Sequence, residues 1–350
     1  MEGEALHSVV APVFNEAQGL ATFHERCTRS LDETGETYEL LYVDDGSHDG
    51  SWEVLQDLAA EDSRVRLVRL SRNFGHQLAI SAGLAHTRGD TVTVIDADLQ
   101  DPPEVIAEMI SRWREGADIV YAVRTHREGE GRFKRATAAA FYRVLRWFAE
   151  VEVPADAGDF RLMSRRAVAA LLGMPEHDRY LRGMVAWIGY ETATVDYTRD
   201  ARFAGETKYP LAKMLRLALD GITGFSVRPL RLATWLGLIV SAAAFMLAVV
   251  LTILRILDTI EVVQGWTSLA VLILLVAGVQ LVTVGALGEY IGRIYNEVRG
   301  RPLYLVRERQ GFTDEEHRAS APGDERQVVV TAPGEGGPPG VDAHGHDRRG

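Results

Sequence analysis

Two long uncharged stretches constrain the fold of this chain more than any other feature. Residues Leu232–Leu254 and Trp266–Gly288 each run past twenty residues without a charged side chain. A helix of that length can cross the hydrocarbon core of a bilayer, whereas helices buried inside soluble domains are usually shorter. The sequence therefore predicts a membrane segment at 232–292 with two transmembrane helices, at about 232–256 and 266–290.

The distribution of charge around these stretches predicts their orientation. Arginines precede the first stretch and follow the second, whereas the connection between them carries one arginine against two carboxylates. Because positive charge favours the cytoplasmic side, we expect both outer ends, and with them the large N-terminal region, to be cytoplasmic. The chain shows no basic and apolar leader at its start, and its single cysteine, Cys27, excludes an intramolecular disulfide. Both features agree with a multi-pass protein whose main domain is cytoplasmic.

The first 125 residues or so alternate short β-branched runs with helical patterns. The strand candidates are HSVVAPVF, YELLYVDD, VRLVRLSR, TVTVIDAD and ADIVYAVR. The segments between them have apolar residues at a spacing of three and four, which is typical of amphipathic helices. Alternation of this kind predicts an α/β domain, in which helices cover a mostly parallel sheet.

Polar motifs follow three of these strand candidates directly. They are PVFNE at 12–16, DDGS at 44–47 and DADLQ at 96–100. Because ligands of such sheets gather at the carboxyl ends of the strands, we expect the three motifs to share one site. The glycine loops that usually cradle dinucleotides and triphosphates, GxGxxG and GxxxxGK[ST], are missing. An acidic edge of this kind would repel phosphates unless a cation lay between them.

The DADLQ motif has the composition of a divalent-cation site. Asp96 and Asp98 lie two apart on what the pattern predicts to be extended backbone, so their side chains should point to one side, and Gln100 continues that register. Few ligands, all of them oxygen, suit Mg²⁺ or Mn²⁺, and we predict Asp98, Gln100 and Asp96 as metal ligands. We expect Asp101, by contrast, to cap the next helix, with Pro102 in its first position.

Six motifs in one consistent order, followed by the two apolar stretches, resemble a known family. The motifs are PVFNE, VDDGSHDGS, LSRNFGHQLAISAGL, VIDADLQDPPE, GDFRLMSRR and RFAGETKYPLAKM. From Val9 to Pro302 the chain resembles the polyprenyl-phosphate glycosyltransferases of family 2, which have a GT-A (Rossmann-like) fold and include the GtrB type and dolichol-phosphate mannose synthase. The resemblance implies a hexosyltransferase that moves one sugar, with inversion, from a nucleotide sugar to polyprenyl phosphate at the cytoplasmic face of a bacterial inner membrane.

The resemblance also implies roles for individual residues. Asp98 and Asp159 would be the catalytic carboxylates, with Asp159 in the position often assigned as a base. A phosphate monoester is already mostly a dianion at pH 7, so Asp159 could instead orient the sugar or an arginine. Arg124 would lie one strand over from the metal. The residues expected to bind the nucleotide, the sugar or the phosphates are Pro12, Phe14, Glu16, Val43, Asp45, Asp96, Ala97, Arg124, Lys134, Arg135, Arg202 and Lys208.

Residues 1–130 would then form the nucleotide-sugar-binding region and 131–231 the acceptor region. Within the latter, GRFKRATAAAFYRVLRWF and YPLAKMLRLALDGITGFSVRPLR each combine an apolar face with basic residues. Cationic amphipathic helices of this kind suit the headgroup layer of a bilayer, where Lys134, Arg135, Arg202 and Lys208 would meet a lipid phosphate. The alternative reading is that these helices pack on the domain instead.

The remaining features restrict the partners and the function classes that the sequence allows. The net charge of −11 argues against a nucleic-acid partner, and 311–350 is rich enough in Gly, Pro and charge to predict a disordered tail. By resemblance alone a UDP-sugar is favoured over GDP-mannose, and the family allows a homotetramer. Alternatives from other classes are a glycoside hydrolase, a non-catalytic membrane scaffold and a flippase component. A scaffold would not need the acidic cluster, and a flippase would need more spans.

Overall fold

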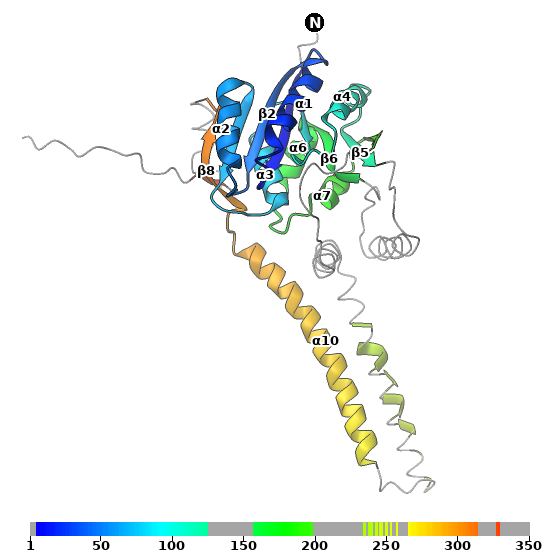
Figure 1. The fold of residues 1–350 in the computed structure, drawn as a ribbon. Helices are drawn as coiled ribbons and strands as arrows, with labels where there is room; N and C mark the ends of the chain where they lie inside the picture. The colour runs from blue at the N-terminus through cyan, green and yellow to red at the C-terminus, as the bar shows by residue number, and fades with distance from the viewer. Residues whose placement is uncertain are drawn as a thin grey trace, which may run out of the picture.

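A computed structural model describes residues 5–124, 157–198, 265–313 and 327–329, together with scattered positions between 234 and 257. In these residues a nine-stranded sheet has helices on both faces (Figure 1). The strands are β1 Leu6–Val13, β2 Thr37–Asp44, β3 Val65–Leu70, β4 Thr91–Val94, β5 Ile119–Arg124, β6 Ala157–Ser164, β7 Thr192–Tyr197, β8 Tyr304–Gln310 and β9 Gln327–Val329. The helices are α1 Leu20–Asp32, α2 Ser51–Glu61, α3 His76–Ala85, α4 Ile106–Arg114, α6 Arg165–Gly173, α7 Leu181–Ile188 and α10 Trp266–Val298, with a 3₁₀ turn, η1, at Pro103–Val105.

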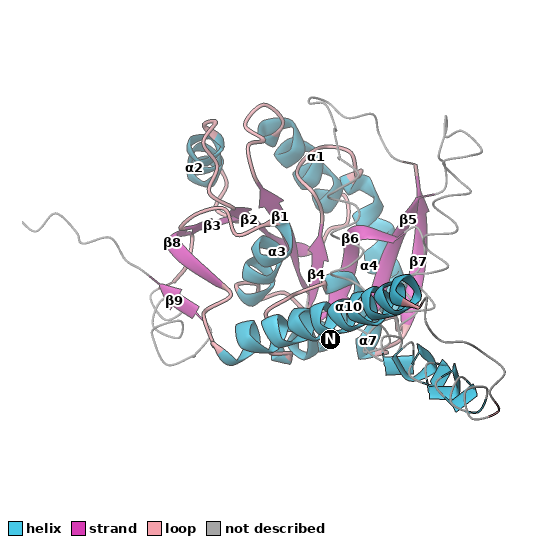
Figure 2. Cartoon of the chain, turned by 90° about the horizontal axis from the view of Figure 1, so that it is seen from below, coloured by secondary structure: helices cyan, strands magenta, loops and turns pink. Residues whose placement is uncertain are grey.

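The strand order is β7-β5-β6-β4-β1-β2-β3-β8-β9, which Figure 2 shows from one side of the sheet to the other. Among the described strands, β1–β2, β1–β4, β2–β3, β5–β7 and β8–β9 pair in parallel. The pairs β3–β8, β4–β6 and β5–β6 are antiparallel. The predicted α/β domain with a mostly parallel sheet is therefore confirmed.

The insertion of β6 between β4 and β5 corrects one expectation. Arg124 ends β5, and β5 pairs with β6 and β7, so Arg124 does not lie one strand over from the DADLQ motif. The direction of β6 matters more for the site. In its antiparallel register Val94 pairs with Arg161, and continuing that register by two residues brings Asp159 opposite Asp96. The sheet thus joins a motif from the middle of the chain to the acidic edge.

Each face of the sheet has its own hydrophobic core. Helices α1, α2 and α4 cover one face with buried residues such as Phe23, Leu55 and Met109. Helices α3, α6 and α7 cover the other. Helix α3 lies so close to β1 that a Cβ on Gly83 would fall 2.3 Å from Cγ1 of Val10. Because glycine has no Cβ, α3 can pack this closely against β1, and this packing fixes the position of its first residue, His76.

A buried ionic network stabilises the opposite, amino end of the sheet. Glu39 is 3% exposed and accepts hydrogen bonds from the Ser8 hydroxyl at 2.6 Å and from Nη1 of Arg66 at 2.9 Å. The backbone N–H and Nε of Arg88 donate to the same carboxylate at 2.9 and 3.1 Å. Burial would raise the pKa of Glu39, but these hydrogen bonds and the charge of Arg66 outweigh it and lower that pKa from its ordinary value.

Substitution of Glu39 by glutamine is expected to destabilise the domain by about 3 kcal/mol, because the buried Arg66 loses its counter-charge. We expect the melting temperature in detergent to fall by roughly 10 °C, whereas the exposed Glu53→Gln control stays near the wild type. Because the folded pKa of Glu39 lies below its unfolded value of 4.5, its contribution is complete above that pH and is lost as pH falls through the folded pKa. An unchanged melting temperature at pH 7 would contradict this assignment.

Helix α10 extends away from the domain (Figure 1). Its segment Leu275–Val298 is long and apolar enough to cross a membrane by length and composition, and no other described helix meets that test. The first predicted span falls largely outside the described residues. Its described positions include a shorter apolar helix, Gly237–Leu247. After α10 the chain enters β8, whose Val306 pairs with Leu70 at the carboxyl end of β3. Helix α10 therefore joins the sheet at its carboxyl edge.

Described residues after β8 contact the domain. The Phe312 ring lies 3.9 Å from the guanidinium carbon of Arg66, and β9, at Gln327–Val329, pairs with β8. Both features fall within the 311–350 stretch for which disorder is expected.

Candidate active site

The loops after β1 and β2 are tied together by hydrogen bonds. The backbone N–H groups of Asn15 and Glu16 donate to the hydroxyls of Ser47 and Ser51, each at 3.0 Å. The backbone N–H of His48 donates to Oδ1 of Asn15 at 2.9 Å, and Asn15 itself has a φ of 58°. The PVFNE and DDGS motifs therefore form one rigid unit at the edge of the sheet.

This unit contains the predicted base and ribose contacts. Pro12 and Val43 pair in register on β1 and β2, and both are buried. Phe14 is 43% exposed at the loop surface, and Glu16 is half-buried. An exposed aromatic ring such as that of Phe14 can stack on a planar base.

Asp45 organises the next loop. Its carboxylate accepts from the backbone N–H groups of Phe74 at 2.7 Å and Gly75 at 2.9 Å. Gly46 has a φ of 74°, and a Cβ there would lie 2.7 Å from the carbonyl carbon of Arg72, so the two loops touch backbone to backbone. Burial raises the pKa of Asp45 although both hydrogen bonds oppose the rise. A carboxylate has further acceptor positions, so Asp45 can still receive a ribose hydroxyl.

The DADLQ segment is a turn and does not continue the strand. Strand β4 ends at Val94, and Leu99 has a φ of 62°. The Asp98 carboxylate accepts the backbone N–H of Gln100 at 3.1 Å. The expectation that Asp96, Asp98 and Gln100 share one face of an extended strand is therefore wrong, because the turn sets their directions. Ala97, between the two aspartates, is buried.

Asp101 does not have the capping role that we predicted. The 3₁₀ turn η1 begins at Pro103, and its cap residue, Pro102, makes no side-chain cap hydrogen bond. Asp101 is 1% exposed and accepts the Tyr197 hydroxyl at 2.5 Å. Nε of Arg124 donates to that hydroxyl at 3.0 Å, and Nη2 lies 3.7 Å from Oδ1 of Asp101. Asp101 is thus buried beside residues of β5 and β7, and it holds Arg124 in place.

His76 connects the DADLQ segment to Asp159. Its Nε2 lies 3.4 Å from Oδ1 of Asp96 and 3.3 Å from Oδ2 of Asp159. The three side chains come from α3, from the turn after β4 and from β6. Burial alone would lower the pKa of His76, but its hydrogen bond to Asp159 and the charge of Asp96 raise that pKa from its ordinary value. An imidazolium is therefore favoured between the two carboxylates.

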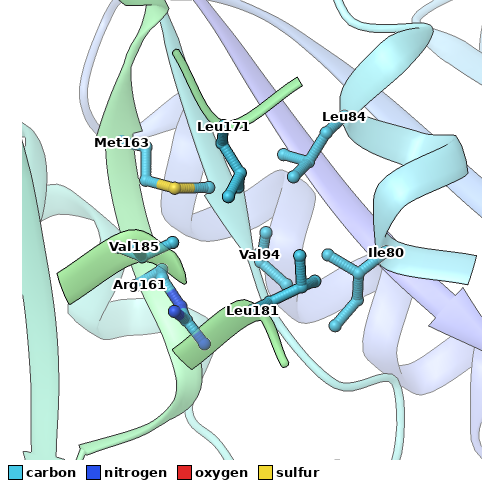
Figure 3. A pocket seen from close by; sticks show the side chains of 8 residues that line it. All are labelled: Ile80, Leu84, Val94, Arg161, Met163, Leu171, Leu181 and Val185. Carbon is cyan, nitrogen blue, oxygen red and sulfur yellow. The ribbon is translucent and has the colours of Figure 1, made fainter. Parts of the chain in front are cut away.

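Two arginines complete the surroundings of Asp159. Nε and Nη2 of Arg182 donate to its two carboxylate oxygens, each at 3.0 Å, and Nη2 of Arg161 donates to Oδ1 at 2.8 Å. Arg161 is 2% exposed and is one of the residues that line a small, mostly apolar pocket between α3, β4, β6, α6 and α7 (Figure 3). Such a buried cation requires its carboxylate partner.

These contacts give the two carboxylates opposite properties. Burial would raise the pKa of Asp159, but hydrogen bonds from His76 and Arg182 and the charge of Arg161 hold it well below its usual range. Burial raises the pKa of Asp96 to about 6, against the charge of His76 and with the help of Asp159, Asp101 and Asp98. Asp159 is thus ionised at neutral pH, with both oxygens bound to cations. Such a group is a poor proton acceptor at neutral pH.

The residues after β4 fit a divalent cation. Oδ1 of Asp96 is buried without a hydrogen-bond partner, and Asp98 lies near enough to raise the pKa of Asp96. Two carboxylates and the Gln100 amide are the hard oxygen donors that Mg²⁺ and Mn²⁺ prefer. In the described part of the chain no three His, Cys, Asp and Glu side chains form a ready-made metal site. A cation held by these residues would take further oxygens from its ligand, such as those of a diphosphate.

The structure thus brings together most of the predicted site residues. Pro12, Val43, Asp45, Asp96 and Asp98 lie at the carboxyl ends of β1, β2 and β4. Asp159 lies near the amino end of β6, which pairs antiparallel with β4, and so at the same edge of the sheet. Arg124 lies farther out, at the end of β5. Lys134, Arg135, Arg202 and Lys208, together with the two amphipathic segments, lie outside the described residues.

The sequence analysis did not single out His76, Arg161 or Arg182. His76 lies within the motif LSRNFGHQ and Arg161 within GDFRLMSRR, so both could have been found as polar residues inside quoted motifs. The signal for Arg182 is weaker, because it lies in an apolar helix that the pattern assigns to packing.

Comparison with known proteins identifies relatives across most of the chain. A family model described as Glycosyl transferase family 2 matches residues 8–172. A Bacillus subtilis (strain 168) protein named uncharacterized glycosyltransferase YkcC is 48% identical over 306 residues, or 87% of this chain and 94% of the relative. The bactoprenol glucosyl transferase of Shigella phage SfX is 41% identical over 306 residues, or 87% of this chain and 99% of the relative.

Among solved structures, mannosyl-3-phosphoglycerate synthase from Rubrobacter xylanophilus aligns with a TM-score of 0.45 and 20% identity, covering 65% of this chain and 74% of that one. The family follows from the sequence relatives, since identity of 48% extends over 94% of the first of them. It also confirms the resemblance seen in the six motifs. The chain therefore belongs to glycosyltransferase family 2, as a hexosyltransferase with a GT-A α/β domain.

Proposed function

We propose that this enzyme transfers one sugar from a nucleotide sugar, with a UDP-sugar as the favoured donor, to a polyprenyl phosphate at a membrane surface. The observation that carries the proposal is the meeting of Asp96, Asp98 and Asp159 at the sheet edge where α10 joins the domain. The phage relative, whose name gives bactoprenol as the group that receives glucose, supports a polyprenyl acceptor.

The donor would lie across the loops after β1, β2 and β4. Phe14 would face the base, Asp45 the ribose and Asp96 the nucleotide phosphates. When bound, Mg²⁺ or Mn²⁺ on Asp98 and Gln100, with Asp96 beside them, would neutralise the charge that grows on the departing diphosphate. Two observations on Asp96 support this role. Burial raises its pKa, and its Oδ1 makes no hydrogen bond although Nε2 of His76 lies 3.4 Å away, so a cation beside this carboxylate would stabilise its ionised form.

The acceptor supplies its own nucleophile. The second pKa of a phosphate monoester is about 6, so polyprenyl phosphate is mostly a dianion at pH 7. One of its oxygens forms the bond to the anomeric carbon while the bond from that carbon to the nucleotide diphosphate breaks, and a single displacement of this kind inverts the configuration. No proton has to be removed, and the chain's task is to align two anions that repel each other.

Asp159 would serve this alignment as an orienting group. Its lowered pKa argues against proton abstraction, and its bonds to Arg182 and His76 fix two cationic groups beside Asp96. Arg124, held by Tyr197 and Asp101, is a third cation near the same edge. From the sequence, Lys134, Arg135, Arg202 and Lys208 are proposed to contact the acceptor phosphate.

The membrane part would place the acceptor at this edge. Helix α10 has 33 residues and is about 50 Å long, whereas a hydrocarbon core is about 30 Å thick. Its uncharged part would span the bilayer, and the charged last turns would reach the domain. With the first stretch as a second span, the enzyme would be a multi-pass protein of a bacterial inner membrane with a cytoplasmic catalytic domain.

The proposal is tested with purified enzyme in vesicles that contain polyprenyl phosphate, a panel of UDP- and GDP-sugars and Mn²⁺. We expect release of nucleoside diphosphate with a UDP-sugar, and only when both the lipid phosphate and the cation are present. Equal release without the lipid would indicate a hydrolase. Consumption of none of the donors would overturn the proposed function.

A further inference from the structure

The last turns of α10 touch the loop that leads into α7. The backbone N–H of His177 donates to Oε2 of Glu297 at 3.1 Å, and Nε2 of the same histidine donates to the backbone carbonyl of Arg301 at 2.6 Å. Nη1 of Arg293 donates to Oδ2 of Asp178 at 3.0 Å. Two successive loop residues, His177 and Asp178, therefore contact the C-terminal end of the candidate membrane helix and the residues just after it.

The other side of this loop is fixed to the catalytic domain. Arg179 is 8% exposed, and its Nη2 donates to the backbone carbonyl of Met174 at 2.7 Å. The backbone N–H of Leu181, the first residue of α7, donates to Oε1 of Gln77 in α3 at 3.1 Å. The loop thus lies between α10 and α3, the helix that carries His76.

The residue that follows is Arg182, which holds both oxygens of Asp159. Only three residues separate Asp178, bound to α10, from Arg182, bound in the site. A shift of the loop would therefore move the guanidinium relative to Asp159, and a displacement of about 1 Å in a catalytic constellation can cost up to about 10²-fold in rate.

We propose that His177 and Asp178 are positioning residues, which brace the start of α7 against α10 and so fix Arg182 on Asp159. The inference rests on the proposed function, since it assigns an effect on sugar transfer. If the inference holds, the geometry of the catalytic centre depends on the position of α10 against the domain. The strands that carry Pro12 and Val43, β1 and β2, make none of these contacts, so donor binding should be independent of the brace.

The test compares two double variants. His177→Ala with Arg293→Gln removes the contacts that the side chains of His177 and Arg293 make, and leaves the hydrogen bond from the His177 backbone to Glu297. His177→Gln with Arg293→Lys keeps a donor and a cation. We expect the first to lower kcat about tenfold with the donor KM within about twofold of wild type, and the second to retain more than about half of kcat. Arg299→Gln, which removes a cation from the same helix end without touching the loop, should behave like the wild type.

Amide hydrogen exchange of the same samples supplies a readout that does not depend on activity. We expect faster exchange in α7 of the first double variant and unchanged exchange in α2. The inference is overturned if kcat and α7 exchange both stay at wild-type values, or if donor KM rises in parallel with the loss of kcat. Absence of sugar transfer by the wild type would instead contradict the proposed function. In that case the exchange result would still show whether His177 and Asp178 hold the start of α7.

Discussion

Replacing Asp98 by alanine is expected to lower the rate of sugar transfer by about 10³-fold, or about 4 kcal/mol of transition-state stabilisation. The alanine removes one of the few oxygens that can hold a divalent cation beside the donor diphosphate. The fold should persist, because Asp98 lies in a surface turn and is half-buried. Initial rates with saturating donor and lipid, together with a melting curve, measure both quantities.

A matched control is available on the same segment. Glu104 is 54% exposed and pairs only at the surface with Arg26, so Glu104→Gln should leave the rate near the wild-type value. Binding of Mn²⁺ in the presence of UDP can also be measured, because the paramagnetic resonance signal of free Mn²⁺ is lost on binding. This readout does not depend on turnover. An Asp98→Ala variant with full turnover and full Mn²⁺ binding would refute the metal role.

The second large effect is expected at Asp159. Asp159→Asn should lower kcat by about 10²-fold to 10³-fold, because asparagine cannot hold Arg182 and His76 by charge. The same variant should be less stable by about 3 kcal/mol, since the buried Arg161 loses its counter-charge. Asp159→Glu, which keeps the charge, should recover most of the stability but less of the rate.

The pH dependence distinguishes orientation from base catalysis. The folded pKa of Asp159 lies well below its ordinary value of 3.8, so its stabilising contribution is complete above that pH and is lost only as pH falls toward the folded pKa. Between pH 6 and 8 Asp159 does not titrate, and the fall of kcat toward pH 6 should come from the acceptor phosphate and from Asp96, whose pKa is raised to about 6. We therefore expect the residual activity of Asp159→Asn to fall in the same pH range as the wild type. Loss of that acid limb in the variant would support a base instead.

The local patterns of the sequence were sufficient to predict much of this molecule. Alternating strand and helix patterns predicted the parallel strands β1 to β4. In this part of the chain a helix connects each strand to the next, which is the regular arrangement that such an alternation indicates. The polar ends of these strands predicted the acidic edge. Both inferences depend on features within short windows, which periodicity and strand direction determine.

The parts that were missed depend on contacts between distant segments. No local pattern in AGDFRLMS indicates that β6 runs antiparallel between β4 and β5, yet this pairing brings Asp159 to Asp96. Likewise, the partner of Asp101 is Tyr197, 96 residues away, so a capping prediction from the next few residues could not find it. The role of Arg182 depends on both α10 and β6, which lie far from it in the sequence.

The central claim is tested most directly by the mass of the lipid product. Enzyme in vesicles is incubated with polyprenyl phosphate, Mn²⁺ and the panel of nucleotide sugars, and the extracted lipids are analysed by mass spectrometry. We expect polyprenyl phosphate to gain the mass of a single sugar residue from one UDP-sugar, with no such species from Asp98→Ala. Free sugar without a glycolipid, or a lipid carrying a sugar chain, would contradict the account.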